Sequence, residues 1–187
     1  MIEAPHTYHA LYLGVHAAHR AAPHIWTDHH CTRLLTSIMS SKPFSWRVVG
    51  VTEEALKRLH QLNYRYKSGE GLTRAHLRPR IETVRDLLKR DEPMSEPEFI
   101  EYWLTHDRTV ICAKGENKPT IAHFIPIENS RGSLFSSNSV AWKHGKAECD
   151  LLKTLYAEHF VRSQLTGERQ TAEVKIAPPV TSLGSLR

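Results

Sequence analysis

A short part of the chain contains two histidines and an asparagine, residue types that can transfer protons and bind a metal ion. The first histidine stands in an apolar run that also contains a proline, and a glycine, the asparagine and the second histidine follow it. These residues are His123, Gly132, Asn138 and His144. An imidazole can accept a proton from an attacking water, and imidazole nitrogen is a common ligand of divalent ions. Residues 120–146 are therefore a candidate site for metal-assisted hydrolysis.

This arrangement resembles the motif of the HNH nucleases, in which a β-hairpin and a following helix form a ββα-metal element. By that resemblance, His123 is the expected general base and Asn138 holds the hairpin in register. His144 is the expected ligand of one divalent ion, with Mg²⁺ as the first expectation and Zn²⁺ as the alternative. His144 alone would hold an ion weakly, so a further ligand is needed, and Glu128 and Glu148 are the candidates.

A second motif supports a rival nuclease interpretation. Asp107, followed by Glu116, Asn117 and Lys118, resembles the Asp and Glu-x-Lys residues of the PD-(D/E)xK nucleases. By that resemblance the two acids bind Mg²⁺ and Lys118 steadies the nucleophile. One straight strand over residues 108–114 would separate the two acids by about 30 Å, at roughly 3.3 Å per residue. This interpretation therefore requires the strand to be short or bent, or another acid such as Glu101 to supply the partner.

Positive charge is concentrated in one segment of the chain. Residues 57–90 contain ten Lys or Arg against three acids, whereas residues 91–107 contain six acids and no Lys or Arg. Guanidinium groups bind phosphates and guanine edges through two-point contacts, so the basic segment predicts a nucleic-acid partner, DNA in preference to RNA. The alternative is that its arginines form ion pairs with the acidic segment. The predicted nucleic-acid contacts are Arg74, His76, Arg78, Arg80, Lys118 and Arg131.

Composition limits the class of protein. The chain has 187 residues and a formal net charge of +5, which fits one folded domain with a polyanion as its partner. Its three cysteines form no Cys-x-x-Cys pair, so neither a disulfide framework nor a thiolate zinc site is expected, and a cytoplasmic location is predicted. No apolar run approaches the roughly 20 residues of a membrane span, so no membrane partner is expected. The N-terminal histidines are a further candidate zinc cluster, namely His16, His19, His24, His29 and His30.

Local signals predict most of the helices. Apolar residues at helical spacing predict two helices between residues 8 and 39, divided at Pro23. Thr52 is a typical N-cap for a helix over residues 53–62. Pro79 suits the first turn of another helix. Ser95 and Glu98 form a capping box, which predicts the start of a helix that ends near Asp107.

Other signals predict strands and a final helix. Residues 45–51 and 72–77 are expected to be extended. Two β-rich runs, residues 108–113 and 119–127, are joined by a polar connection that contains a glycine, and this pattern predicts a β-hairpin. A last helix is expected over residues 140–160.

The predicted fold is mixed α/β, of the α+β class, with helices packed around a small sheet that contains a central β-hairpin. A single domain is expected over residues 1–161. It would contain N-terminal helices over residues 1–44, the basic segment over residues 57–90, and the hairpin and helix over residues 108–161. Residues 162–187 are polar and contain prolines, which predicts a flexible tail.

Two classes of function follow from these patterns. The first is a metal-dependent endonuclease that hydrolyses DNA, of a restriction or phage-defence type, with the PD-(D/E)xK interpretation as its variant. The second is a non-enzymatic nucleic-acid-binding module, in which the same arginines bind and the histidines are incidental. A nuclease that cuts both strands commonly works as a two-fold dimer, so the first class also predicts a homodimer.

Overall fold

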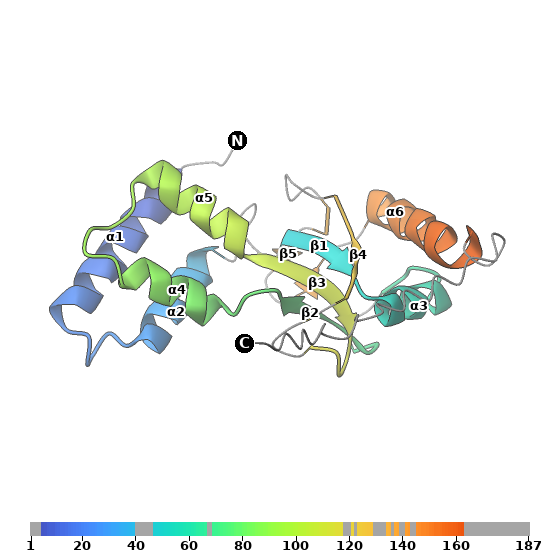
Figure 1. Cartoon of the computed structure of the whole chain (residues 1–187), viewed down its shortest axis with the longest axis horizontal. Helices are drawn as coiled ribbons and strands as arrows, with labels where there is room; N and C mark the ends of the chain where they lie inside the picture. Colours follow the sequence, from blue (N-terminus) through green and yellow to red (C-terminus); the bar gives the residue numbers. More distant parts are fainter. Residues whose placement is uncertain are drawn as a thin grey trace, which may run out of the picture.

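A computed structural model describes most of the chain before residue 163. The described residues are 5–39, 47–66, 69–117, 121, 123–128, 134–135, 137–138, 141–142 and 145–162. Within these ranges the molecule is elongated, with one group of helices at one end and a small sheet in the middle. The helices α3 (Glu53–Gln61) and α6 (Lys146–Tyr156) lie at the other end (Figure 1). The predicted α+β class is confirmed. The expected tail at residues 162–187 lies almost entirely outside the described residues.

The helical group has its own apolar core. Tyr12, Leu35, Leu87, Phe99 and Trp103 are fully enclosed in it. The two helices predicted before residue 40 are confirmed, and so is the capping box, where the Glu98 carboxylate accepts bonds from the Ser95 N–H (2.9 Å) and hydroxyl (2.6 Å). The helices are α1 (Pro5–Ala21), α2 (Asp28–Met39), α4 (Arg80–Leu88) and α5 (Glu96–His106).

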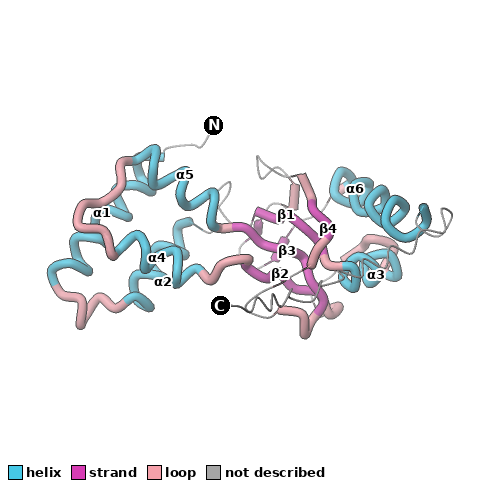
Figure 2. The backbone as a smooth tube through the Cα atoms, in the orientation of Figure 1, coloured by secondary structure: helices cyan, strands magenta, loops and turns pink. Residues whose placement is uncertain are grey.

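The sheet has the strand order β2-β3-β1-β4 (Figure 2). The central strands β1 and β3 run parallel, whereas β2 is antiparallel to β3 and β4 is antiparallel to β1. The strands are β1 (Arg47–Val51), β2 (Leu72–His76), β3 (Arg108–Ala113) and β4 (Ile125–Pro126). A separate two-stranded sheet pairs β5 (Ser137–Asn138) with β6 (Ala141–Trp142).

The predicted hairpin between residues 108–113 and 119–127 is not formed by the described residues. β4 pairs with β1 instead of β3. The reason lies in β3, whose residues Thr109 to Cys112 are fully buried, so it is a central strand that needs a partner on each edge. β1 and β2 occupy those edges, and β4 adds to the remaining edge of β1.

Two helices at the other end of the sheet contribute to a second apolar core. Leu56 and Leu59 of α3 (Glu53–Gln61) pack with Leu152 of α6 (Lys146–Tyr156) and with β1 residues. α6 continues into the π-helical turn η1 (Ala157–Arg162). The helix predicted over residues 140–160 therefore begins later than expected, because Ala141–Trp142 pair with β5 and Gly145 is the N-cap.

None of the described helices is both long and apolar enough to cross a bilayer.

Candidate functional site

A pocket of about 430 Å³ opens where the start of α3, the turn after β3 and the segment before β4 meet. We call it the His123 pocket. It is lined by groups from four separate parts of the chain, and two carboxylates and two imidazoles are among them. The lining residues are Thr52, Glu53, Glu116, His123, Phe124, Ile125, Pro126 and His159.

Thr52 joins the helix α3 to the wall of the pocket. Its hydroxyl caps the helix by accepting the Ala55 N–H at 3.2 Å, and it donates to Glu116 Oε2 at 2.6 Å. The same Oε2 atom accepts the Ala113 N–H at 2.8 Å, so the turn after β3 is folded back onto its own strand. Glu116 is therefore held in place by two donors on one of its oxygens, Oε2.

The positive end of α3 reaches the pocket because Thr52 and Glu53 both line it. Glu53 Oε1 lies 3.0 Å from His159 Nε2, so a carboxylate orients this imidazole. Both side chains remain open to solvent, with 58% exposure for Glu53 and 40% for His159. An imidazole oriented by a carboxylate is the arrangement that proton-transfer sites use to fix a tautomer.

The exposed His123 is positioned through its neighbour Phe124. The Phe124 ring lies so close to Gly50 of β1 that a Cβ atom at Gly50 would stand 2.2 Å from Phe124 Cδ2. Only glycine fits at position 50. The strand β4 begins directly after Phe124, at Ile125. The short segment that contains His123 is thereby seated on the sheet, while its imidazole stays accessible.

The nearby thiol is not a nucleophile at neutral pH. Cys112 is fully buried in β3, and burial, together with the charge of Glu116, raises its pKa to about 11. A cysteine nucleophile reacts as the thiolate, so Cys112 contributes packing and no covalent chemistry.

The structure brings together two of the residues that the two motifs singled out. His123 of the HNH-like motif and Glu116 of the Asp and Glu-x-Lys motif line the same pocket. Glu128 is exposed and follows the buried Ile127, outside the pocket lining. Asn138 lies in β5. Three further predicted site residues fall outside the described residues, namely Lys118, Arg131 and His144.

Asp107 and Glu116 do not form a joint site. They stand at opposite ends of the six-residue strand β3, about 20 Å of extended chain. Asp107 is buried, with 1% side-chain exposure, and its carboxylate accepts bonds from Arg80 Nε (2.7 Å) and Nη2 (2.9 Å). The shared Mg²⁺ of the PD-(D/E)xK interpretation therefore has no counterpart in this pair of acids.

The predicted arginine contacts lie mostly inside the molecule. Arg74 is only 6% exposed, and burial together with the charge of Arg80 lowers its pKa to about 10. His76 Nε2 lies 3.2 Å from Asp107 Oδ1, and Arg80 forms the bidentate pair with the same acid. Arg78 is bonded to Asp86 and to the Tyr102 hydroxyl. Their role in binding nucleic acid stays a prediction, and only part of each side chain reaches the surface.

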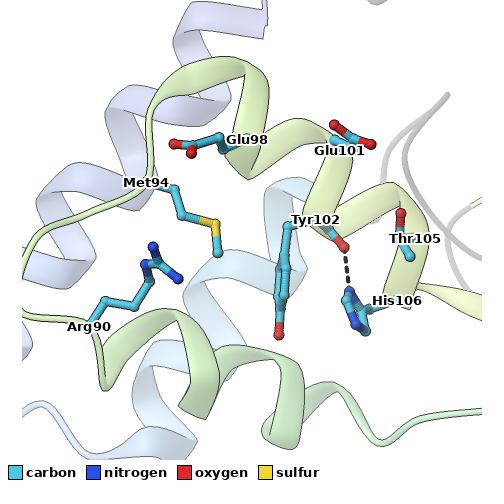
Figure 3. A pocket seen from close by; sticks show the side chains of 7 residues that line it. All are labelled: Arg90, Met94, Glu98, Glu101, Tyr102, Thr105 and His106. Atoms are coloured by element: carbon cyan, nitrogen blue, oxygen red, sulfur yellow. Dashed lines mark hydrogen bonds between the residues drawn. The ribbon is translucent and has the colours of Figure 1, made fainter.

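A second pocket of about 330 Å³ lies on the helical group, against α5 (Figure 3). Three of its polar side chains form local bonds. Glu98 caps α5, the Tyr102 hydroxyl bonds to Asp86, and His106 Nδ1 lies 2.7 Å from the Tyr102 carbonyl oxygen. Its lining residues are Arg90, Met94, Glu98, Glu101, Tyr102, Thr105 and His106. Its one imidazole, His106, is bonded to a backbone carbonyl and to no carboxylate of the described residues. This pocket is therefore a weaker candidate for catalysis than the His123 pocket.

Within the described ranges, no three His, Cys, Asp or Glu side chains come together as a metal site. Glu116 and Glu53 contribute carboxylates to the His123 pocket, but each is already bonded to a protein group. The described residues on their own do not fit a bound ion, and the expected ligand His144 lies beyond them. The N-terminal histidines of the candidate zinc cluster are all described, and no three of them come together as a metal site.

Glu53 and His159 were not singled out by any sequence motif. Glu53 directly follows the predicted N-cap Thr52, and His159 stands 106 positions further along the chain. Spacing along the sequence offers no signal for such a pair.

A scan against protein-family models, a search of curated proteins and a search of solved structures each found no match to this chain. The function therefore has to be argued from the site.

Proposed function

We propose that the chain is an endonuclease that hydrolyses phosphodiester bonds of DNA in the His123 pocket. The observation that supports this most directly is that His123 and Glu116, which two different nuclease-like motifs singled out, line one pocket together with the Glu53–His159 pair. Acid and base groups from four chain segments around one pocket are the arrangement that proton-transfer catalysis requires.

In this proposal His123 takes the proton of the attacking water. Its imidazole is exposed on the wall of the pocket, and no hydrogen bond from the described residues occupies it. His159, oriented by Glu53, is the group placed to give a proton to the leaving oxygen. Glu116 is a positioning residue, because its carboxylate fixes the turn beside α3. The positive end of α3 favours an incoming phosphate.

The requirement for a divalent ion is a separate part of the proposal. Mg²⁺ is the first expectation, and Zn²⁺ is the alternative. A bound ion would stabilise negative charge on the phosphate. The resemblance assigns this ion to His144, with Glu128 as the candidate for the further ligand, and no step above depends on it.

The same proposal includes DNA as the partner, a two-fold homodimer and a cytoplasmic location. The location is supported by the three free cysteines, which are consistent with a reducing compartment. Lys57, Arg58 and Arg65 are exposed cations in or near α3, at the end of the molecule that contains the pocket. A cut in both strands of a duplex would require two copies of the pocket related by a two-fold axis.

The first test is cleavage of supercoiled plasmid by the full chain, with Mg²⁺, with Mn²⁺ and with EDTA. We expect nicking with a divalent ion, and a loss of at least about 100-fold in rate for His123→Ala, because general-base catalysis contributes roughly 10²–10⁴-fold. The matched control is His24→Ala, an exposed histidine in the loop between α1 and α2, which should cleave like the wild type. Binding of the plasmid should survive both substitutions.

The alternative is the non-enzymatic nucleic-acid-binding module, and the exposed cations of α3 favour it equally. Salt-sensitive binding without cleavage under any metal would establish this alternative and remove the endonuclease. Equal cleavage by His123→Ala and the wild type would keep a nuclease but place its active site elsewhere.

A further inference from the structure

A strip of ring and cationic side chains runs along the contact between α3 and the end of α6. Three successive pairs of residues form it. Glu53 lies against His159, with 3.0 Å between Oε1 and Nε2. Lys57 Nζ stands 5.3 Å from the centre of the Phe160 ring. The His60 and Tyr156 rings stack, with centres 3.9 Å apart and planes inclined by 10°.

These rings are partly accessible, although Tyr156 and Phe160 also pack against the second apolar core. His60, Lys57 and His159 are exposed, and Tyr156 and Phe160 are half-buried. Phe99 and Trp103 of the helical core are fully buried by comparison. The strip therefore keeps part of its side chains accessible at the contact between α3 and the end of α6.

The backbone at the end of α6 departs from a regular α-helix to form this surface. Residues 157–162 form the π-helical turn η1, which contains both His159 and Phe160. These consecutive residues both reach α3, the first at Glu53 and the second at Lys57. π-Helical turns are rare and occur frequently at functional sites.

The strip and the His123 pocket are continuous. Glu53 and His159 form the first pair of the strip and also line the pocket. From Glu53 to His60 the helix rises by about 10.5 Å, at 1.5 Å per residue. Stacked bases are spaced by about 3.4 Å, so the strip has the length of about three nucleotides.

We propose that this strip binds the unpaired bases of single-stranded DNA by stacking and leads the strand into the His123 pocket. The inference rests on the proposed function and adds the substrate class, a strand whose bases are free to stack. Base stacking on aromatic side chains tolerates any sequence, because every base has a π face.

The charges of the strip predict how binding responds to salt. Lys57 is the cation of the three pairs, and Glu53 is their carboxylate. Binding should therefore come mainly from stacking, with about one phosphate neutralised. The slope of log affinity against log salt should be near −0.7 at the strip, since each neutralised phosphate of a single strand contributes about that much.

The experiment measures the affinity of the full chain for a fluorescent twelve-nucleotide oligo-dT and for a duplex of the same length, over a range of salt. The variants are His60→Gln, which changes an exposed side chain, and Phe160→Leu, which removes the ring and keeps apolar bulk. The control is Trp26→Leu, an aromatic residue of 38% exposure at the far end of the helical group. Thermal unfolding checks that every variant is folded.

We expect each strip variant to bind oligo-dT roughly 5- to 150-fold more weakly, which corresponds to about 1–3 kcal/mol for loss of one stacking residue. Duplex binding should not change, and Trp26→Leu should bind like the wild type. Oligo-dT affinity that is unchanged in both strip variants, or an equal loss for duplex, would overturn the inference.

Cleavage assays on the same proteins separate this inference from the proposed function. If cleavage depends on His123 but the strip variants bind oligo-dT normally, the stacking surface is wrong and the active site stands. If the strip variants lose oligo-dT binding and no protein cleaves, the surface stands and the proposed hydrolysis is wrong.

Discussion

At the scale of single residues, Asp107 is a buried carboxylate with two cationic or polar partners. It is buried between Arg80, which bonds to both of its oxygens, and His76, whose Nε2 lies 3.2 Å away. Burial acts to raise the pKa of this carboxyl, but contacts with His76 and Arg80 outweigh burial and hold the pKa at about 2, below its ordinary 3.8. A buried carboxylate that is charged in the folded state links folding stability to pH.

We predict that Asp107→Asn destabilises the fold by about 3–5 kcal/mol at neutral pH, because Arg80 would lose its buried partner. In the wild type the lowered pKa adds stability above about pH 4, and this contribution disappears as the pH falls toward 2. It amounts to about 2 kcal/mol. Urea unfolding from pH 2 to 7 measures both effects.

The control for Asp107→Asn is Asp91→Asn, at the exposed pair with Arg20, where side-chain exposures are 91% and 53%. That change should cost less than about 1 kcal/mol. Equal losses in the two variants, or an unchanged acid profile in Asp107→Asn, would show that Asp107 does not have the assigned role.

At the scale of elements, the connection between α3 and the turn after β3 determines the shape of the pocket. The Thr52 hydroxyl both caps α3 and donates to Glu116. Ser95 and Glu98 cap α5 in a comparable way, on the helical group and outside the His123 pocket. Removing the Ser95 cap should therefore reduce helix stability alone, whereas removing the Thr52 cap should also disturb the His123 pocket.

Thr52→Ala and Ser95→Ala should each lower the free energy of unfolding by about 1 kcal/mol, which is typical for loss of an N-cap. We predict that only Thr52→Ala lowers the rate of plasmid cleavage, because only Thr52 fixes Glu116, and that Thr52→Ser restores it. Urea unfolding and cleavage measured on the same samples provide the comparison. Identical cleavage by the two alanine variants would contradict the assigned role of Thr52.

Helix starts were the part of the fold that the sequence predicted best. The Thr52 cap and the Ser95–Glu98 box involve contacts within three residues, so their signals are local. The hairpin predicted after Ala113 is not formed by the described residues, because turn chemistry indicates where a chain can reverse and not which strand it will join. The edge of β3 was already taken by β1, a segment about 60 residues earlier in the chain.

The candidate site could be predicted only in part for the same reason. His123 and Glu116 were found because each belongs to a short motif. Glu53 and His159 meet only after α3 and the end of α6 pack together in the second apolar core. Burial of the arginines could not be predicted from local sequence patterns either. It depends on Asp107 lying at the end of α5, where β2 and α4 converge.

At the scale of the whole molecule, the chain alternates between the helical group and the sheet. α1 and α2 precede β1, α4 and α5 follow β2, and the chain returns to the sheet at β3. Neither apolar core is built from one continuous stretch of sequence. The Arg80–Asp107 pair links two connections between the sheet and the helical group. Arg80 begins α4, which follows β2, and Asp107 directly precedes β3. The His123 pocket lies on the sheet side of this junction, beside α3.

The measurement that tests the central proposal most directly is a crystal structure of the full chain with a short oligodeoxynucleotide, in which Ca²⁺ replaces Mg²⁺ to prevent cleavage. We predict a phosphodiester group in the His123 pocket, with a water within about 3.2 Å of both the phosphate and an imidazole nitrogen of His123. A phosphate bound against Arg74 and Arg80, or in the pocket beside α5, with no nucleotide in the His123 pocket, would contradict the proposal.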